Sequence, residues 1–211
     1  MAKPELIARQ SRRPSGWLGE IVGRVMAFDT ARANRVAAQQ LAVQAGEAVL
    51  EIGCGHGRTL ARIAQAPCGF LAGIDASEVM VRLARRRLHR QIEAGRAEVS
   101  LSSSTALPYP DARFDAALAV HVVYFWKDAS TDLREIRRVL RPGGRLLLGY
   151  RPLDAEALAA LPATVYSLRS VEETEGLLAE AGFAAIRSTD HPIGKSGITC
   201  TIAFVPTSRR L

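Results

Sequence analysis

The spacing of apolar residues along this chain changes near residue 47, and the change predicts two kinds of organisation. Between residues 16 and 46 apolar positions recur at helical intervals, which predicts one or two amphipathic helices that end at Gly46. Residues 1–15 carry prolines among polar and basic residues without a sustained period, so we expect a mobile or lid-like arm there. From Ala48 onward, short apolar runs alternate with helical patterns.

The apolar runs predict strands over residues 48–52, 70–75, 97–101, 116–122, 145–150, 184–190 and 198–205. Helical patterns lie between most of them, over residues 57–66, 76–95, 132–140 and 170–183. This alternation indicates βα units and a mainly parallel sheet. The last two runs have no helix between them, so they form a hairpin and the final strand runs antiparallel. We expect an N-terminal arm and helical lid over residues 1–45, followed by an α/β domain over residues 46–211.

The stretch VLEIGCGHG, residues 49–57, places an acid and three glycines between the first strand and its helix. Glycine allows positive φ and close approach of a ligand to the backbone, and the helix N-terminus offers free N–H groups. A dinucleotide loop would need its third glycine where Arg58 stands, and no Gly-Lys-Ser/Thr of a phosphate loop follows. Glu51 would also repel a pyrophosphate, which disfavours a nicotinamide oxidoreductase and favours a cationic or amino-bearing ligand.

A second acid, Asp75, closes the second strand, where a carboxylate can accept both hydroxyls of a ribose. The ligand therefore has the features of a nucleoside without a diphosphate that carries an amino-bearing or positive tail. S-adenosylmethionine fits this description.

Two further stretches, LPYPDARFDAALAV and LREIRRVLRPGGRLLLGY, follow in order along the chain. Together with the glycine loop and the GID that ends the second strand, they resemble the class I S-adenosylmethionine-dependent methyltransferases. The resemblance is to small-molecule enzymes similar to those of quinone biosynthesis. It implies a doubly wound, seven-stranded Rossmann-like sheet of order 3-2-1-4-5-7-6 with strand seven reversed. The Pro142-Gly143-Gly144 segment is expected to form a turn before strand five.

The resemblance also implies roles for matching residues. The cofactor contacts would come from Glu51, Gly53, Cys54, Gly55, Gly57, Asp75, Ala76, Met80, Ser103, Ser104 and Val120. Among these, Glu51 and the glycine loop would meet the methionine part, Asp75 the ribose, and Ala76 and Met80 the adenine. The family often has an acid after strand three, where this chain has three serines at 102–104.

His121 lies near the carboxyl end of the fourth strand and is the first candidate for a catalytic base, because an unperturbed imidazole titrates near neutral pH. Tyr124 is the second candidate. A lid from Arg12 to Met26 is expected to supply Trp17 to the pocket of a small-molecule substrate. No spacing of cysteine and histidine suggests a metal site.

Composition narrows the alternatives. The 211 residues are 48% apolar, which suits one globular domain, and three widely spaced cysteines favour a reducing cytoplasm. No apolar run is long enough to span a bilayer and the first residues lack a secretory signal, so we expect a cytoplasmic protein.

The net charge of +7 raises the alternative of a nucleic-acid methyltransferase, but the arginines are scattered and are not interleaved with aromatic residues. The stretch AVHVVYFWKD after strand four also lacks the Pro-Pro-Tyr/Phe and Pro-Cys patterns of enzymes that methylate bases. A non-catalytic protein that keeps a nucleoside pocket is a second alternative.

Overall fold

The computed structural model describes residues 5–151, 162–193 and 196–207. Three helices come first along the chain: α1 (Glu5–Arg12), α2 (Gly16–Asp29) and α3 (Ala31–Leu41). The strands are β1 (Ala48–Ile52), β2 (Phe70–Asp75), β3 (Ala97–Leu101), β4 (Phe114–Val120), β5 (Leu140–Tyr150), β6 (Ala184–Ile193) and β7 (Ser196–Phe204). The remaining helices are α4 (Arg58–Ile63), α5 (Glu78–Arg87), α6 (His89–Glu93), the short 3₁₀ helix η1 (Val123–Phe125), α7 (Ala129–Val139) and α9 (Val171–Glu180).

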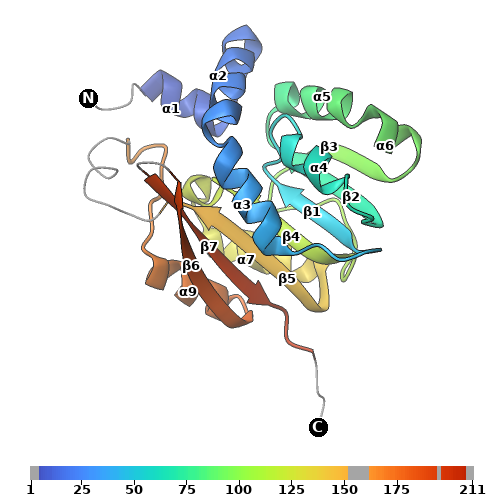
Figure 1. Ribbon diagram of the computed structural model, residues 1–211. Helices are drawn as coiled ribbons and strands as arrows, with labels where there is room; N and C mark the ends of the chain where they lie inside the picture. The colour runs from blue at the N-terminus through green and yellow to red at the C-terminus, as the bar shows by residue number, and fades with distance from the viewer. Residues whose placement is uncertain (1–4, 152–161, 194–195, 208–211) are drawn as a thin grey trace.

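All seven strands join one sheet in the order β3-β2-β1-β4-β5-β7-β6, which confirms the predicted order. The strands from β3 to β5 pair in parallel, and β7 pairs antiparallel with both β5 and β6. The reversal of strand order beside β1 leaves a crevice between β1 and β4 at their carboxyl ends. Helices α1 and α2 stand beyond the sheet at the top of Figure 1.

Two apolar cores sandwich the sheet, as expected for strands buried on both faces. Leu50 and Ile52 of β1 point into a core that α7 and α9 share. Val49 points into the opposite core with α3, α4 and α5, and α3 crosses the near face of the sheet in Figure 1. Glu51 lies between Leu50 and Ile52 in sequence, so its side chain is on the same face of the sheet as that of Val49, where it is a buried acid.

The arm expected over residues 1–15 contains a helix over Glu5–Arg12 that its sequence pattern did not predict. Glu5 and Arg9 form an ion pair one helical turn apart at 2.8 Å. Ala8 is buried beside Val165 and Tyr166, so tertiary packing stabilises a segment whose own periodicity is too short to detect.

Several other boundaries also differ from the sequence prediction, three of them near the candidate site or in its supporting strands. The helix expected over residues 76–95 is interrupted at Leu88, whose φ of −98° and ψ of 14° separate α5 from α6. Strand β4 starts and ends two residues earlier than expected, so His121 follows the strand. Pro142 and Gly143 lie within β5, where the pairing with β4 shifts register between Phe114 and Ala116.

Candidate functional site

A cavity of about 1240 Å³ lies at the carboxyl ends of β1, β2 and β4 and is bounded by α1 and α2. Most residues that the sequence analysis assigned to a site line this cavity, namely Glu51, Gly53, Cys54, Gly55, Asp75, Ala76, Met80, Ser103, Ser104, Val120 and His121. Gly57 and Tyr124 do not line it. The fold therefore gathers residues from the loops after four strands, and Met80 from α5, around one space.

The three glycines of the loop after β1 all have positive φ, at 66° for Gly53, 53° for Gly55 and 76° for Gly57. They differ in what a side chain would meet. A Cβ on Gly53 would lie 2.5 Å from Val122, and one on Gly57 would lie 3.1 Å from Ala84 of α5. A Cβ on Gly55 would meet no protein atom within 4 Å. Gly55 is thus the glycine whose bare backbone faces the open cavity, whereas Gly57 permits α4 to pack on α5.

Glu51 is 4% exposed, and its Oε2 atom has no hydrogen-bond partner among the described residues. Burial raises the pKa of this carboxyl to about 8, although the Thr59 hydroxyl and the Leu60 N–H both act to lower it. A buried carboxyl with an unpartnered oxygen is costly unless a ligand completes it. The amino group of S-adenosylmethionine would supply both a donor and a positive charge, so the residue fits this cofactor.

Asp75 links the ends of β1 and β2. Its Oδ2 accepts the N–H of Gly55 and its Oδ1 accepts the N–H of Ser77, each at 2.9 Å. Burial raises the pKa of Asp75, and these two bonds act against the rise. The N-cap of α5 is Ser77, which accepts the Met80 N–H, so Asp75 is not the helix cap. Each carboxylate oxygen has a second lone pair for a ligand hydroxyl.

The N-terminal arm is bonded to the loop after β2. The Arg13 Nε donates to the carbonyl of Ala76 at 2.9 Å, and the Ser77 hydroxyl donates to the carbonyl of Pro14 at 2.5 Å. Nearby, a Cβ on Gly23 of α2 would lie 2.6 Å from the Met80 Cε atom. The arm therefore packs directly on the loop predicted to hold the adenosine.

The loop after β3 contains an acid–serine pair that the sequence analysis did not anticipate. The Ser104 hydroxyl donates to Oδ1 of Asp132, a residue of α7 that is 3% exposed and lines the cavity. Burial raises the pKa of Asp132, and the bond from Ser104 acts against the rise. Ser103 is exposed and bonds only locally, to the Thr105 hydroxyl at 2.9 Å.

Asp132 therefore supplies a carboxyl near the loop where the family motif usually carries one. The sequence does hold a signal for it. Ala129, Asp132, Leu133 and Ile136 are all buried at helical spacing, so position 132 is a polar residue on an apolar helix face.

His121 follows β4 with a φ of 57°, and its N–H donates to the Gly149 carbonyl at 2.7 Å. Its Nδ1 lies 3.2 Å from the Tyr124 hydroxyl, and the tautomer decides which group donates. Burial, and then the nearby charge of Arg151, lower the pKa of His121 to about 4. The imidazole is thus neutral near pH 7 and lies on the cavity wall.

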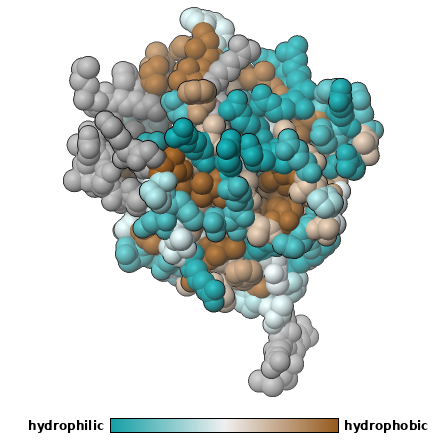
Figure 2. Space-filling view, viewed as in Figure 1, coloured by the Kyte–Doolittle hydropathy of each residue, from teal (hydrophilic) through white to brown (hydrophobic). Residues whose placement is uncertain are grey.

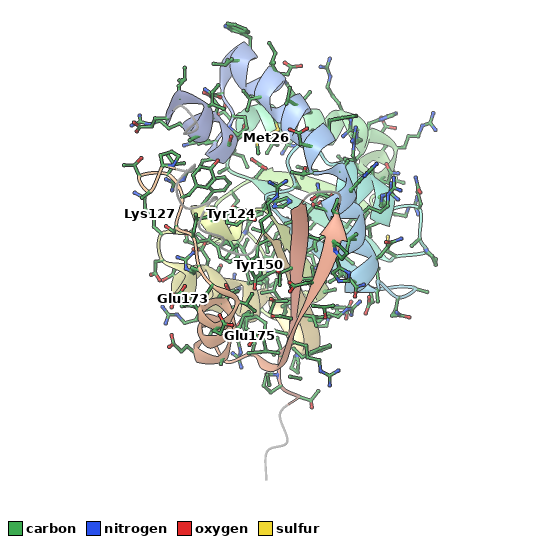
Figure 3. The ribbon with its side chains drawn as sticks, turned by 60° about the vertical axis from the view of Figure 1, so that its left-hand side comes forward. Met26, Tyr124, Lys127, Tyr150, Glu173 and Glu175 are labelled. Atoms are coloured by element: carbon green, nitrogen blue, oxygen red, sulfur yellow. The ribbon has the colours of Figure 1, made fainter. Side chains whose placement is uncertain are left out.

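Tyr124 stands behind His121. Its hydroxyl accepts the N–H of Arg151, and burial raises its pKa well above the usual range. The rings of His121 and Tyr124 are stacked with their centroids 6.1 Å apart. In Figure 3, Tyr124 lies below Met26, a residue of α2. Tyr124 fits the role of a positioning residue for His121 better than that of a second base.

Apolar side chains also line the cavity, at Leu6, Met26, Phe125, Trp126 and Val165, together with charged residues such as Glu5, Arg9, Lys127 and Asp128. Trp17, which the sequence analysis placed in the pocket, is 76% exposed and does not line the cavity. Met26, nine residues later on α2, lines it instead, because Trp17 and Met26 lie on opposite faces of the helix.

Among the described residues, no group of three or more histidine, cysteine, aspartate or glutamate side chains could hold a metal ion. Over the same part of the chain, every helix is too short or too polar to cross a membrane.

A family model described as a methyltransferase domain matches residues 50–148, which include the glycine loop, Asp75 and His121. The sheet order, with its reversed β7, is that of the same fold. The chain belongs to the class I S-adenosylmethionine-dependent methyltransferases.

Its relatives include O-methyltransferase resE of Aspergillus sclerotiorum, 34% identical over 78% of this chain and 65% of that protein. O-methyltransferase rstn1 of Aspergillus nomiae NRRL is 33% identical over 76% of this chain and 75% of that protein. The chain thus spans just under two thirds of the length of resE and three quarters of that of rstn1. The apo form of the S-adenosylmethionine-dependent methyltransferase SibL shares the fold, with a TM-score of 0.74, 23% identity, and coverage of 95% of this chain and 62% of SibL.

Proposed function

We propose that this protein transfers the methyl group of S-adenosylmethionine to a hydroxyl oxygen of a small, largely apolar molecule. The observation that carries the proposal is one continuous cavity lined both by the loop residues predicted to hold the cofactor and by apolar side chains. Glu51, Gly55 and Asp75 line it, and so do the apolar side chains of Met26, Phe125 and Val165. Its volume of about 1240 Å³ exceeds the roughly 300–1,000 Å³ of a pocket for one drug-sized ligand, so cofactor and acceptor fit together. The name O-methyltransferase, shared by the relatives resE and rstn1, supports oxygen as the acceptor atom.

When bound, S-adenosylmethionine supplies a methyl group activated by the positive sulfur. In this proposal Glu51 binds the amino group, Asp75 binds the ribose hydroxyls, and Ala76 and Met80 flank the adenine. Val120 and His121 border the place where cofactor and acceptor meet. The work of these residues is alignment and exclusion of water, because the leaving group needs no further activation.

His121 would accept the proton that the acceptor hydroxyl loses. This role needs the tautomer in which Nδ1–H donates to Tyr124 and Nε2 is free, and the Tyr124 hydroxyl can accept that bond. The low pKa of His121 keeps Nε2 unprotonated at pH 7 but also makes it a weak base.

Two measurements test the function. Titration calorimetry should detect binding of S-adenosylmethionine and no comparable binding of NADH. Mass spectrometry should detect a gain of one methyl group on members of a panel of phenols and aliphatic alcohols. An apolar amine of matched size serves as the control for the acceptor atom. Methyl transfer to RNA or DNA alone, or cofactor binding without any transfer, would replace this proposal by one of the two alternatives.

A further inference from the structure

Helix α2 carries an exposed apolar stripe formed by Trp17, Ile21, Val25 and Phe28. Their exposed fractions are 76%, 50%, 56% and 79%. Residues spaced by four, four and three positions lie on one face of an α-helix. Figure 2 shows the same feature as hydrophobic surface at the top of the molecule, over α2. We call these four residues the α2 stripe.

The opposite face of α2 is already packed against the protein. A Cβ on Gly19 would lie 2.6 Å from the backbone of Pro14, and one on Gly23 would meet Met80 at the same distance. Met26 on this face lines the cavity. A surface helix normally turns a polar face to water, and a helix that is apolar on every side is normally covered on every side. Among the described residues nothing covers the α2 stripe, although its composition calls for a partner.

The net charge of the chain segment that carries the stripe indicates the partner. Residues 5–35 contain six arginines and three acids, and the whole chain has a net charge of +7. Arg12, Arg32 and Arg35 are all exposed. A second copy of the chain would bring like charges together at this surface. An anionic lipid surface would instead match both the positive surroundings and the apolar stripe.

We propose that α2 docks this protein on the surface of a membrane that contains anionic lipid. In this arrangement Trp17, Ile21, Val25 and Phe28 enter the boundary between headgroups and acyl chains, and the nearby arginines face the anionic headgroups. The axis of α2 lies in the plane of the membrane surface, and the chain does not cross it. Gly23 and Met26, on the other side of the same helix, keep their places at the cavity.

The docking goes beyond the proposed methyl transfer and can be measured without it. If both hold, an apolar acceptor dissolved in the lipid would reach the cavity along the side of α2. This inference assigns the acceptor class more narrowly, as a molecule that partitions into membranes.

The test is co-sedimentation of the full chain with phosphatidylcholine vesicles, with and without phosphatidylglycerol. We expect binding to the anionic vesicles, at least about tenfold weaker binding to the neutral ones, and loss of binding at high salt. The variant Trp17→Ser/Phe28→Ser should weaken binding to the anionic vesicles by about tenfold or more, because it removes the two largest inserted side chains without changing charge.

The matched control is Leu101→Ser, which removes an apolar side chain that is 48% exposed but lies on β3. It should bind vesicles as the unmodified chain does. The affinity of the double variant for S-adenosylmethionine reports whether its fold is intact. Equal binding of the double variant and the unmodified chain, or no binding to anionic vesicles, overturns the proposal. Light scattering that detects a dimer of the unmodified chain but not of the double variant overturns it in favour of a second copy.

Discussion

The Nδ1 atom of His121 lies 3.2 Å from the hydroxyl of Tyr124, and that hydroxyl in turn accepts the N–H of Arg151. These bonds hold the imidazole in place. The backbone of His121 has a φ of 57°, a conformation that few non-glycine residues adopt. Backbone strain of this kind occurs most often at functional sites. It singles out His121 as the residue whose replacement is most informative.

The first prediction concerns turnover by a His121→Asn variant on a substrate whose hydroxyl must lose its proton. We expect a fall of about 10²-fold, the lower end of the range for general-base catalysis, because the low pKa makes His121 a weak base. Calorimetry should give nearly unchanged affinity for the cofactor. His89→Asn, an exposed change on α6, is the control. Turnover within about threefold of the unmodified enzyme would remove His121 from the mechanism.

The second prediction is a pH dependence of stability. The pKa of His121 is about 4 in the folded state, against an ordinary value of 6.5, so between these values only the unfolded chain binds the proton. The free energy of unfolding therefore rises with pH across this window, by up to about 3 kcal/mol. Denaturant titrations at pH 4.5 and pH 7 should show a smaller difference for His121→Asn than for the unmodified chain. An unchanged difference would mean that His121 is not buried in its neutral form.

A third prediction concerns Gly55. A Gly55→Val variant places its side chain in open cavity, so it should weaken cofactor binding by more than its backbone strain explains. The matched control is Gly46→Val, because Gly46 also has positive φ and open space around it but does not line the cavity. Both variants should lose about 1–3 kcal/mol of stability, and only Gly55→Val should lose affinity. Equal affinities for the two would show that the cofactor does not approach Gly55.

The fourth prediction concerns Asp75, whose two oxygens face Gly55 and Ser77. An Asp75→Asn variant replaces one acceptor by a donor and removes the charge. We expect a loss of one to two decades in affinity for S-adenosylmethionine. Binding of the 2′-deoxy analogue of S-adenosylmethionine distinguishes lost recognition of the ribose from a general loss of folding. The variant should distinguish the two cofactors less well than the unmodified chain does, and undiminished discrimination would contradict a ribose role.

The fifth prediction concerns the Ser104–Asp132 pair. Ser104→Ala leaves a buried carboxylate without its donor, so the free energy of unfolding should fall by about 1–3 kcal/mol at pH 7. Ser103→Ala, a change at an exposed neighbour, should alter it by no more than about 0.5 kcal/mol. Thermal denaturation of both variants compares them directly. Similar losses would mean that the pair does not stabilise this loop.

The sheet was predictable because its signals are local. Apolar runs between helical patterns gave the strands of the parallel half, and the missing helix before residue 198 gave the reversed β7. The capping box at Ser170 and Glu173 likewise confirms the start expected for α9. The site residues at strand ends followed from the sheet, since carboxyl ends of parallel strands meet at one edge.

What the sequence did not reveal depends on contacts between distant segments. Helix α1 depends on Ala8 packing against residues more than 150 positions away. Asp132 reaches the cavity wall only because α7 lies under the loop of Ser104. The exposure of Trp17 depends on which face of α2 meets α5, and apolar residues on both faces gave no preference.

The two bonds between the arm and the loop of Ala76 and Ser77 have a consequence for the order of events. The bonds couple the docked position of the arm to the present conformation of the loop. A ligand that binds the loop therefore favours the docked arm, and the docked arm raises the affinity of the loop for that ligand by the same factor. Binding of the cofactor to the loop would then shift the arm toward its docked position before the acceptor enters. The reverse also follows. Release of the arm would lower the affinity for the demethylated cofactor and so would determine the rate of its exchange.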